Sequence, residues 1–315
     1  MMKKCAVIGS INTDMVARTP RFPAPGESII GSVFRTEFGG KGANQAYAAA
    51  MMGNSVAMLG CVGKDRFGSS LLSQLREASV DTACIRVWPG RATGAAFVMT
   101  DSAGGNSIIV ISGANELCTA SYIRQHEALF RETDCVLLQL EIPLEGVEEA
   151  VGLAKKYGKT VILNPAPARE DIPDTLLAAV DVLTPNETEL ALLSGCHTDT
   201  PEDVVRAAET LLARGVGTVI VTLGAQGAML VTPGQAKLLP TRRVKAVDST
   251  GAGDCFNGVA AGLLADGKEL EEAVRTANIA ASISTTREGA MCSMPTREEV
   301  EAVRRQCSDA GEEVI

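Results

Sequence analysis

Hydrophobic residues gather in short runs along the chain, and amphipathic stretches with helical spacing separate most of these runs. Runs such as AVIG, CVLLQL, TVIL and TVIVT are continuous rather than alternating, which is typical of parallel strands buried on both faces. The predicted strands are 4–9, 55–61, 135–140, 160–163, 182–183, 218–222 and 228–231. The predicted helices are 43–52, 68–78, 120–131, 144–157, 187–193, 201–214 and an alanine-rich one that ends near residue 266. This alternation predicts a three-layer α/β/α domain with a mainly parallel central sheet.

Two segments, 13–38 and 83–112, lack the helical spacing. The first holds three prolines within six residues, and the second contains TGAAFVMT and NSIIVIS joined by the turn DSAGGN. Strands without intervening helices do not suit a parallel core. We therefore expect these segments to form a small, mostly antiparallel lid sheet. The large domain then comprises 1–12, 39–82 and 113–315.

Composition narrows the possible partners. The chain has 315 residues, of which 46% are hydrophobic, and 29 basic against 38 acidic side chains give a net charge of −9. An acidic chain repels phosphate backbones and anionic membranes, so we expect neither nucleic acid nor membrane as a partner. No apolar run approaches the roughly 20 residues that span a bilayer, and MMKKCAVIGS predicts a first strand rather than a signal peptide. Nine cysteines without a C-x-x-C pair predict reduced thiols in a cytoplasmic protein.

The strongest chemical signal is DSTGAGDCFNG at 248–258, which follows the strand-like segment 243–247 and opens the alanine-rich helix. Gly251 and Gly253 leave backbone N–H groups uncovered at a helix N-terminus, where the helix dipole favours anions. Such a turn suits a phosphoryl group in transit, and Asp254 is placed to accept a proton from an attacking hydroxyl. The alternative is a glycine-rich turn in which Asp254 only caps the helix.

A second glycine-rich stretch, FGGKGANQA at 38–46, also opens a helix. It is not a Walker A loop, because Gly42 follows Lys41 where that motif has Ser or Thr. The N–H groups of Gly40 and Gly42, together with the Asn44 amide, suit the hydroxyls of a small polar ligand. A tight turn with a solvated lysine explains the stretch equally well.

Polar residues also follow the predicted strands at one edge of the sheet. Asn12 and Asp14 come after the first strand, and Glu141 closes the strand VLLQLE. Ligands of open α/β sheets lie in the crevice beyond the carboxyl ends of the strands. A carboxylate there can bind two vicinal hydroxyls. Turn formation and capping by Asn and Asp are the alternative.

Two further segments allow both a ligand role and a structural role. Asn186 and Glu189 begin a helix, so they either hold the waters of Mg²⁺ near a nucleotide or simply cap that helix. The loop TLGAQG at 222–227 lies between two predicted strands. It either lets phosphates approach the backbone or forms only a hairpin turn.

These motifs, together and in this order, resemble the ribokinase branch of the PfkB carbohydrate kinase family over nearly the whole chain. The most specific stretches are GGKGANQA and DSTGAGDCFNG, supported by GSINTD, ISGAN, LQLE, LNPAPA, PNETE and TLGAQG. The resemblance implies a ribokinase-like fold and ATP-dependent phosphorylation of a sugar's primary hydroxyl, with D-ribose as the leading substrate and 2-deoxyribose or another sugar as the alternative. A non-catalytic sugar sensor would be expected to have lost Asp254 or its glycines, and both are present.

The resemblance also implies roles for individual residues. Asp254 corresponds to the catalytic base, and Gly251, Ala252 and Gly253 correspond to the anion hole for the γ-phosphate. The implied sugar-binding residues are Asn12, Asp14, Gly40, Lys41, Gly42, Asn44, Glu141 and Asp254. The implied nucleotide-binding residues are Asn186, Thr222, Leu223, Gly224, Ala225, Gln226, Gly227, Gly253 and Asn278.

Metals and self-association follow from the same resemblance. Glu189 is implied to support Mg²⁺ indirectly. A monovalent cation, usually K⁺, is implied beside the anion hole. The residues that match its site are Asp248, Thr250, Ser284, Arg287, Gly289 and Ser293, several of them through backbone carbonyls. The resemblance also implies a homodimer formed through the lid sheets.

Overall fold

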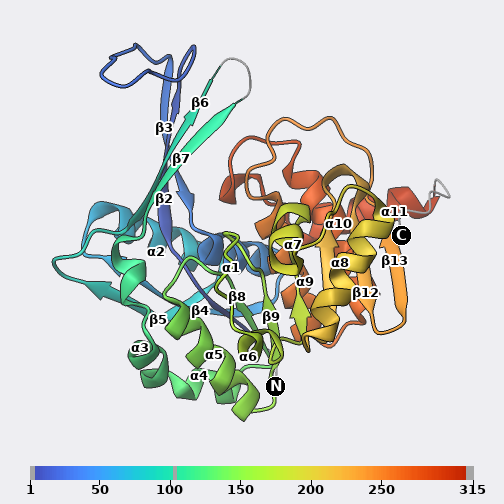
Figure 1. Ribbon diagram of the computed structural model, residues 1–315. Coiled ribbons are helices and arrows are strands. Elements are labelled where there is room, and N and C mark those ends of the chain that lie inside the picture. The colour runs from blue at the N-terminus through green and yellow to red at the C-terminus, as the bar shows by residue number, and fades with distance from the viewer. Residues whose placement is uncertain (1–3, 102–104, 310–315) are drawn as a thin grey trace.

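The computed structural model describes residues 4–101 and 105–309, so the middle of the predicted turn DSAGGN lies outside the described residues. A nine-stranded sheet forms the centre of the molecule in the order β13-β12-β11-β10-β9-β8-β1-β4-β5 (Figure 1). Its strands are β1 (Lys4–Ile8), β4 (Ser55–Gly63), β5 (Asp81–Trp88), β8 (Cys135–Leu138), β9 (Thr160–Leu163), β10 (Val182–Leu183), β11 (Thr218–Thr222), β12 (Ala228–Thr232) and β13 (Gln235–Leu239). All neighbouring pairs are parallel except β11–β12 and β12–β13. The predicted mainly parallel sheet is confirmed.

Helices cover both faces of this sheet and bury two apolar clusters. One face packs against α1 (Lys41–Met51), α2 (Arg66–Glu77), α9 (Ala252–Ala265), α10 (Leu270–Ser284) and α11 (Arg297–Asp309). The other packs against α3 (Ala120–Gln125), α4 (Glu127–Glu132), α5 (Leu144–Lys156), α6 (Asp174–Leu177), α7 (Glu187–Ser194) and α8 (Pro201–Ala213). Burial on both faces explains why the central strands read as continuous apolar runs.

A second sheet projects from the large one, at the top of Figure 1. Its order is β3-β2-β6-β7, formed by β2 (Asn12–Arg18), β3 (Val33–Gly39), β6 (Gly94–Thr100) and β7 (Asn106–Ile111). The β2–β3 and β6–β7 pairs are antiparallel, and β2 pairs with β6 in parallel. A small, mostly antiparallel sheet built from two distant segments is therefore observed as predicted.

One boundary of that prediction is wrong. Residues 83–88 belong to β5, which pairs in parallel with β4 at the edge of the large sheet. The helix α2 lies between β4 and β5, so these elements form an ordinary strand–helix–strand crossover. As an edge strand β5 has an interrupted pattern of burial, which makes its sequence similar to that of the exposed small sheet.

Other differences concern boundaries and the C-terminal third. The segment 243–247, which reads as strand-like, has no strand partner and lies in the connection between β13 and α9. The predicted helix 120–131 is divided at His126 into α3 and α4. The sequence analysis did not predict β13, α10 or α11.

The structure bears on two features expected from the composition, the lack of a membrane span and the state of the cysteines. Within the described ranges, no helix is both long and apolar enough to cross a membrane. The cysteines at positions 5, 61, 84, 118, 135, 196, 255 and 292 are free thiols, and five of these are buried.

Candidate active site

The N-terminus of α9 is shaped by two glycines that serve different purposes. Gly251 caps the helix in the left-handed region with φ 76°, and a Cβ atom there would lie 3.0 Å from the Cα and Cβ atoms of Ala290. A side chain at Gly253 would meet nothing within 4 Å. The first turn of α9 therefore has open space beside Gly253, as an anion site requires, and the Ala252 N–H donates to the Ser249 carbonyl oxygen at 3.2 Å.

Asp254 lies one residue inside this turn and is only 8% exposed. Its Oδ2 accepts a hydrogen bond of 2.9 Å from Asn44 Nδ2, and its Oδ1 accepts one of 2.9 Å from Gln45 Nε2. Both donors lie on α1, which packs closely against α9 at Gly258. Any larger residue there would clash, because a Cβ atom at Gly258 would come 2.2 Å from the Gln45 carbonyl oxygen. The two glycine-rich stretches of the sequence therefore meet at one carboxylate.

Glu141 gathers the residues predicted to bind a sugar on the other side of α1. Its Oε2 accepts hydrogen bonds from Ser10 Oγ at 2.5 Å, from the Lys41 backbone N–H at 3.3 Å and from Asn12 Nδ2 at 3.5 Å. Asn115 fixes Asn12 in turn, because Asn115 Nδ2 donates to Asn12 Oδ1 at 2.7 Å. The ends of β1 and β8 and the start of α1 thus form one polar cluster.

Asp14 reaches this cluster from β2 of the small sheet. Its carboxylate lies over Gly39, where a Cβ atom would come 2.3 Å from Asp14 Oδ2. Burial is the main cause that raises the pKa of Asp14 to about 7. The neighbouring carboxylates raise the pKa further, and they belong to Glu141, Glu37 and Asp254. The small sheet therefore contributes a carboxyl group that titrates near neutral pH.

Lys41 is the cation within this group of acids. Burial opposes its charged form, but the surrounding carboxylates outweigh burial and raise the pKa of its ammonium group. These carboxylates are, in order of effect, Asp254, Glu141, Glu189 and Asp14. Lys41 therefore stays charged and offsets part of the negative charge of the site.

The residues predicted to bind a nucleotide flank the neighbouring strand ends. Asn186 forms an isolated parallel bridge with Thr222. Asn186 Oδ1 accepts from the Glu189 N–H at 2.8 Å, and Glu189 Oε2 accepts from the Asn186 N–H at 2.9 Å. These two hydrogen bonds form a capping box at the start of α7. Burial raises the pKa of Glu189, although the Asn186 N–H opposes this rise.

The loop 222–227 and Asn278 also have structural contacts. The loop joins the antiparallel pair β11–β12, and its tip is the exposed turn Gly224–Gln226. Asn278 Nδ2 donates to the Leu239 carbonyl oxygen at 2.8 Å, and Thr241 Oγ1 donates to the Asn278 carbonyl oxygen at 3.0 Å. Asn278 thus holds the end of β13.

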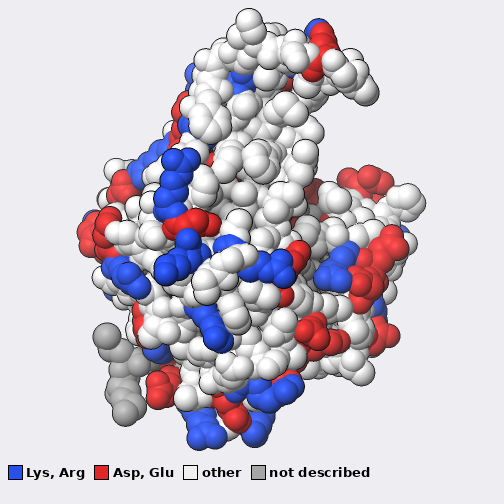
Figure 2. All heavy atoms as spheres, turned by 90° about the vertical axis from the view of Figure 1, so that its left-hand side faces the viewer, with Lys and Arg blue, Asp and Glu red and all other residues white. Residues whose placement is uncertain are grey.

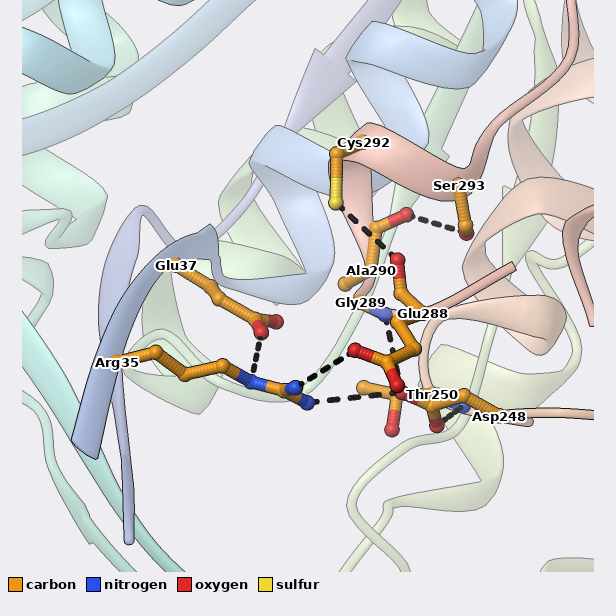
Figure 3. Close-up of polar contacts among 9 residues, drawn as sticks. All are labelled: Arg35, Glu37, Asp248, Thr250, Glu288, Gly289, Ala290, Cys292 and Ser293. Atoms are coloured by element: carbon orange, nitrogen blue, oxygen red, sulfur yellow. Dashed lines mark hydrogen bonds and ion pairs between the residues drawn. The ribbon is translucent and has the colours of Figure 1, made fainter. Parts of the chain in front are cut away.

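Of the residues matched to a monovalent-cation site, Asp248 and Thr250 lie before α9, and Gly289 and Ser293 lie after α10 (Figure 3). Ser284 is the last residue of α10. Asp248 Oδ1 accepts from the Thr250 N–H at 2.9 Å, and Asp248 Oδ2 accepts from the Gly289 N–H at 3.0 Å. Burial opposes ionisation of Asp248, but these backbone N–H groups lower its pKa overall. An ionised carboxylate therefore connects the loop before α9 to the loop after α10.

The side chains of the remaining residues matched to the cation site are engaged in other contacts. Ser284 Oγ donates to the Ala281 carbonyl oxygen at 2.9 Å, and Ser293 Oγ donates to the Ala290 carbonyl oxygen at 2.8 Å. The Arg287 guanidinium pairs with Glu299, so Arg287 offers a cation only its carbonyl. In the ranges that the structure describes, no three His, Cys, Asp or Glu side chains cluster as metal ligands.

The small sheet touches this loop pair through a residue that the sequence analysis missed. Arg35 of β3 contacts Glu37 Oε1 at 2.5 Å and Glu288 Oε2 at 3.1 Å, and it approaches Asp248 Oδ2 to 3.9 Å (Figure 3). Glu37 also lies against Gly289, where a Cβ atom would come 3.1 Å from Glu37 Oε2. An ion-pair cluster therefore links the projecting sheet to the loops beside α9.

The structure also assigns contacts to polar residues that had no predicted role. These are Ser10, Gln45, Asn115, Gln139 and Asn164, all buried. Gln139 shows the signal that could have revealed them, because it interrupts the otherwise apolar run CVLLQL of a buried strand. A polar side chain in such a run needs a partner in the interior.

Comparison with known proteins decides the family. The sequence model of the pfkB family carbohydrate kinases matches residues 2–297. The chain belongs to the PfkB carbohydrate kinase family. Among curated members, it is 42% identical to the ribokinase of Haemophilus influenzae over 299 residues, which covers 95% of this chain and 97% of that protein. It is 36% identical to the deoxyribokinase of Salmonella typhi over 294 residues, which covers 93% of this chain and 96% of that protein.

A solved member of the PfkB family supports the same assignment. The structure of Arabidopsis thaliana ribokinase complexed with ribose and ATP matches with a TM-score of 0.90 and 35% identity, covering 96% of this chain and 99% of that chain. The α/β fold with a mostly parallel sheet and a separate small sheet is therefore that of ribokinase structures. The chain is an ATP-dependent sugar kinase of this family.

Proposed function

We propose that this kinase transfers the γ-phosphoryl group of ATP to the 5-hydroxyl of D-ribose, giving D-ribose 5-phosphate and ADP. One observation carries the proposal: the buried carboxylate of Asp254 lies in the first turn of α9, and it is close enough to Lys41 and Asp14 to act on their charges together with Glu141. A hydroxyl held by that cluster can face a phosphoryl group held by the first turn of α9. The small sheet brings Asp14 to the same place and acts as a lid over the sugar.

The proposed transfer proceeds in line. Asp254 accepts the proton of the 5-hydroxyl as the sugar oxygen forms its bond to the γ-phosphorus, and the bond from that phosphorus to the β-phosphate oxygen breaks. The N–H groups of Gly251, Ala252 and Gly253 stabilise the charge on the equatorial oxygens. Asn44 is suited to orient the hydroxyl, because its Oδ1 is buried and has no partner.

The nucleotide is assigned to the strand ends on the far side of α9. The loop 222–227 and Asn186 offer backbone and amide groups to the phosphates, and Asn278 lies near the base. Glu189 would support Mg²⁺ through the carboxylate oxygen that the capping box leaves free, and the ion would offset the charge of the phosphates.

Ribose is favoured over 2-deoxyribose because the cluster offers paired acceptors and donors for vicinal hydroxyls. Asn12 is fixed by Asn115, and Asp14 is buried. A site built to bind a hydroxyl rejects the analogue without it by about 10⁴–10⁵-fold. The deoxyribokinase among the relatives makes 2-deoxyribose the second candidate.

The substrate is tested by measuring kcat/KM for D-ribose, 2-deoxyribose and fructose in a coupled ADP assay. We expect D-ribose to exceed both others. A higher kcat/KM for 2-deoxyribose or fructose would replace the proposed substrate and leave the kinase assignment intact.

K⁺ is proposed to bind beside the anion hole at the carbonyl-rich loops around Asp248. Its role is to order the loop that precedes Asp254, since Asp248 and Thr250 lie in that loop. We expect faster turnover in K⁺ than in a large organic cation at the same ionic strength. Equal rates would reject the site.

We also propose that the chain forms a homodimer through the outer face of the small sheet. Strand register places Phe97 and Ile109 opposite each other, on the face away from Asp14. Phe34 and Ile111 share this face, and the four side chains are 46–69% exposed. Figure 2 shows few charged side chains over this projecting part. A contiguous exposed apolar face is typical of an interface.

Sedimentation of the wild type and of Ile109→Asp tests the dimer. We expect twice the monomer mass for the wild type and a shift toward monomer for the variant. A monomeric wild type at micromolar concentration would overturn this part of the proposal.

A further inference from the structure

Gln45 follows Asn44 on α1 and is fully buried. Its Nε2 donates to Asp254 Oδ1 at 2.9 Å and to Asn164 Oδ1 at 3.1 Å. Its Oε1 accepts from Gln139 Nε2 at 2.6 Å. The side chain therefore uses both amide protons and its oxygen within the interior.

The direction of these hydrogen bonds is fixed by chemistry. An ionised Asp254 can only accept, so the amide nitrogen of Gln45 must face it. Gln139 donates to the other end of the same amide, so a flip of Gln45 would lose all three contacts. A buried network that is satisfied in only one arrangement holds its members rigidly.

The same network continues to the backbone of the anion turn. Asn164 Nδ2 donates to the Thr184 carbonyl oxygen at 3.0 Å, and Thr184 Oγ1 donates to Asn257 Oδ1 at 2.5 Å. Asn257 Nδ2 then donates to the Gly253 carbonyl oxygen at 2.8 Å. One chain of buried polar groups thus reaches both the carboxylate of Asp254 and the turn that precedes it.

The two donors to Asp254 differ in how free they are. Asn44 has a buried Oδ1 without a partner, so it can rearrange toward a bound hydroxyl. Gln45 has no unused group. We propose that Gln45 is a positioning residue that keeps the Asp254 carboxylate aimed at the sugar hydroxyl while Asn44 adjusts to the substrate. This inference rests on the proposed function of Asp254 as the proton acceptor.

Two variants test the inference in full-length enzyme, with whichever sugar the wild type phosphorylates. Gln45→Met keeps the length of the side chain and removes its donors. Gln45→Glu keeps an acceptor for Gln139 but places a second acid beside Asp254. We expect kcat to fall about tenfold to a hundredfold in both, with KM for the sugar changed less than about threefold. We expect the acid limb of the kcat–pH profile to move up by about one pH unit in Gln45→Met and further in Gln45→Glu.

Asn54 supplies a matched control at the opposite end of α9. It is also a buried amide, and its Nδ2 donates to the Gly262 carbonyl oxygen at 3.1 Å and to Asp266 Oδ2 at 2.7 Å. Asn54→Ala should lower the melting temperature and leave the acid limb in place.

The outcomes separate the inference from the proposed function. A wild type without sugar-dependent ADP release would refute the function itself. If the wild type is active, an unmoved acid limb in both Gln45 variants would overturn the inference. So would a limb that moves equally in Asn54→Ala. If Gln45→Met does not fold, the acid limb of the kcat–pH profile of Gln45→Glu alone tests the inference.

Discussion

Two aspartates stand at the two ends of the glycine turn 248–254, and the protein holds them in different ways. Asp254 is 8% exposed and accepts hydrogen bonds from two uncharged amides on α1. Asp248 accepts from two backbone N–H groups, and beyond these it faces Arg35 of the small sheet at 3.9 Å. Arg35 is 38% exposed, and its partner Glu288 is 73% exposed.

The difference shows where this turn is rigid and where it can change. Buried neutral donors are insensitive to salt and to the position of the small sheet. Exposed ion pairs contribute about 0.2–1 kcal/mol and weaken as ionic strength rises. The chemistry is thus anchored on the α1 side, while the contact with the small sheet can open and close at little cost.

Replacing the anchored carboxylate should have the largest effect. Asp254→Asn removes the proposed proton acceptor but keeps a side chain of the same size, so kcat should fall by about 10²–10⁴-fold. Binding of sugar and nucleotide, measured by calorimetry, should persist. Full ATP-dependent turnover in Asp254→Asn would contradict the proposed role of Asp254.

The two glycines of the turn should separate stability from activity. Gly251→Ala forces a left-handed residue toward Ala290, so it should cost about 1–3 kcal/mol of unfolding free energy. Gly253→Ala has open space and should leave stability nearly unchanged, yet its methyl group enters the anion site and should lower kcat about tenfold to a hundredfold. Urea titration and steady-state kinetics measure the two effects. Equal stability of both variants would contradict this account.

Asp14 lies between the two regions and should make the affinity for sugar depend on pH. Its pKa is about 7 in the folded protein without sugar and near 3.8 when unperturbed. The carboxylate binds hydroxyls better than the neutral acid, so affinity should rise about tenfold from pH 5.5 to pH 8 and then level. Isothermal titration across this range measures the rise, and Asp14→Asn should abolish it.

Asp14 should make the unfolding free energy fall with pH, whereas it should make the affinity for sugar rise. In the absence of sugar, the unfolded chain releases the Asp14 proton above about pH 4, whereas the folded protein keeps it until about pH 7. This group therefore lowers the unfolding free energy as pH rises through that window. Asp14→Asn should remove this part of the decline, which urea titrations at pH 5 and pH 8 would reveal.

Breaking the exposed cluster should have the smallest effect. Arg35→Met removes the contacts to Glu288 and Asp248, and we expect KM for the sugar or for K⁺ to change about twofold to fivefold. The change should shrink at 0.5 M salt, whereas the defect of Gln45→Met should persist. A large, salt-independent defect in Arg35→Met would contradict the view that the exposed ion pairs of Arg35 contribute less than the buried contacts of Asp254.

The sequence predicted the central strands and the motifs well because both depend on local pattern. The residues of 39–46 and 248–258 were proposed as ligand-binding turns, and the structure brings them together at Asp254. The capping role of Asn186 also followed from its position before a helix.

What could not be predicted depends on contacts between distant segments. Gln45 and Asn164 form their hydrogen bond only because α1 packs beside the end of β9. Arg35 meets Glu288 across 253 positions of sequence. β5 could not be assigned to its sheet because an edge strand carries a weaker apolar pattern than a central one.

The single tryptophan of the chain occupies a telling place. Trp88 ends β5, and the chain enters the small sheet at Gly94, six positions later. Its indole stacks with Arg86, whose guanidinium carbon lies 4.0 Å from the ring centroid. Because indole emission responds to nearby charge and hydration, the fluorescence of the unlabelled protein is an intrinsic reporter at the junction of the two sheets. Stopped-flow mixing with sugar can therefore test, without any added dye, whether the projecting sheet moves when sugar binds.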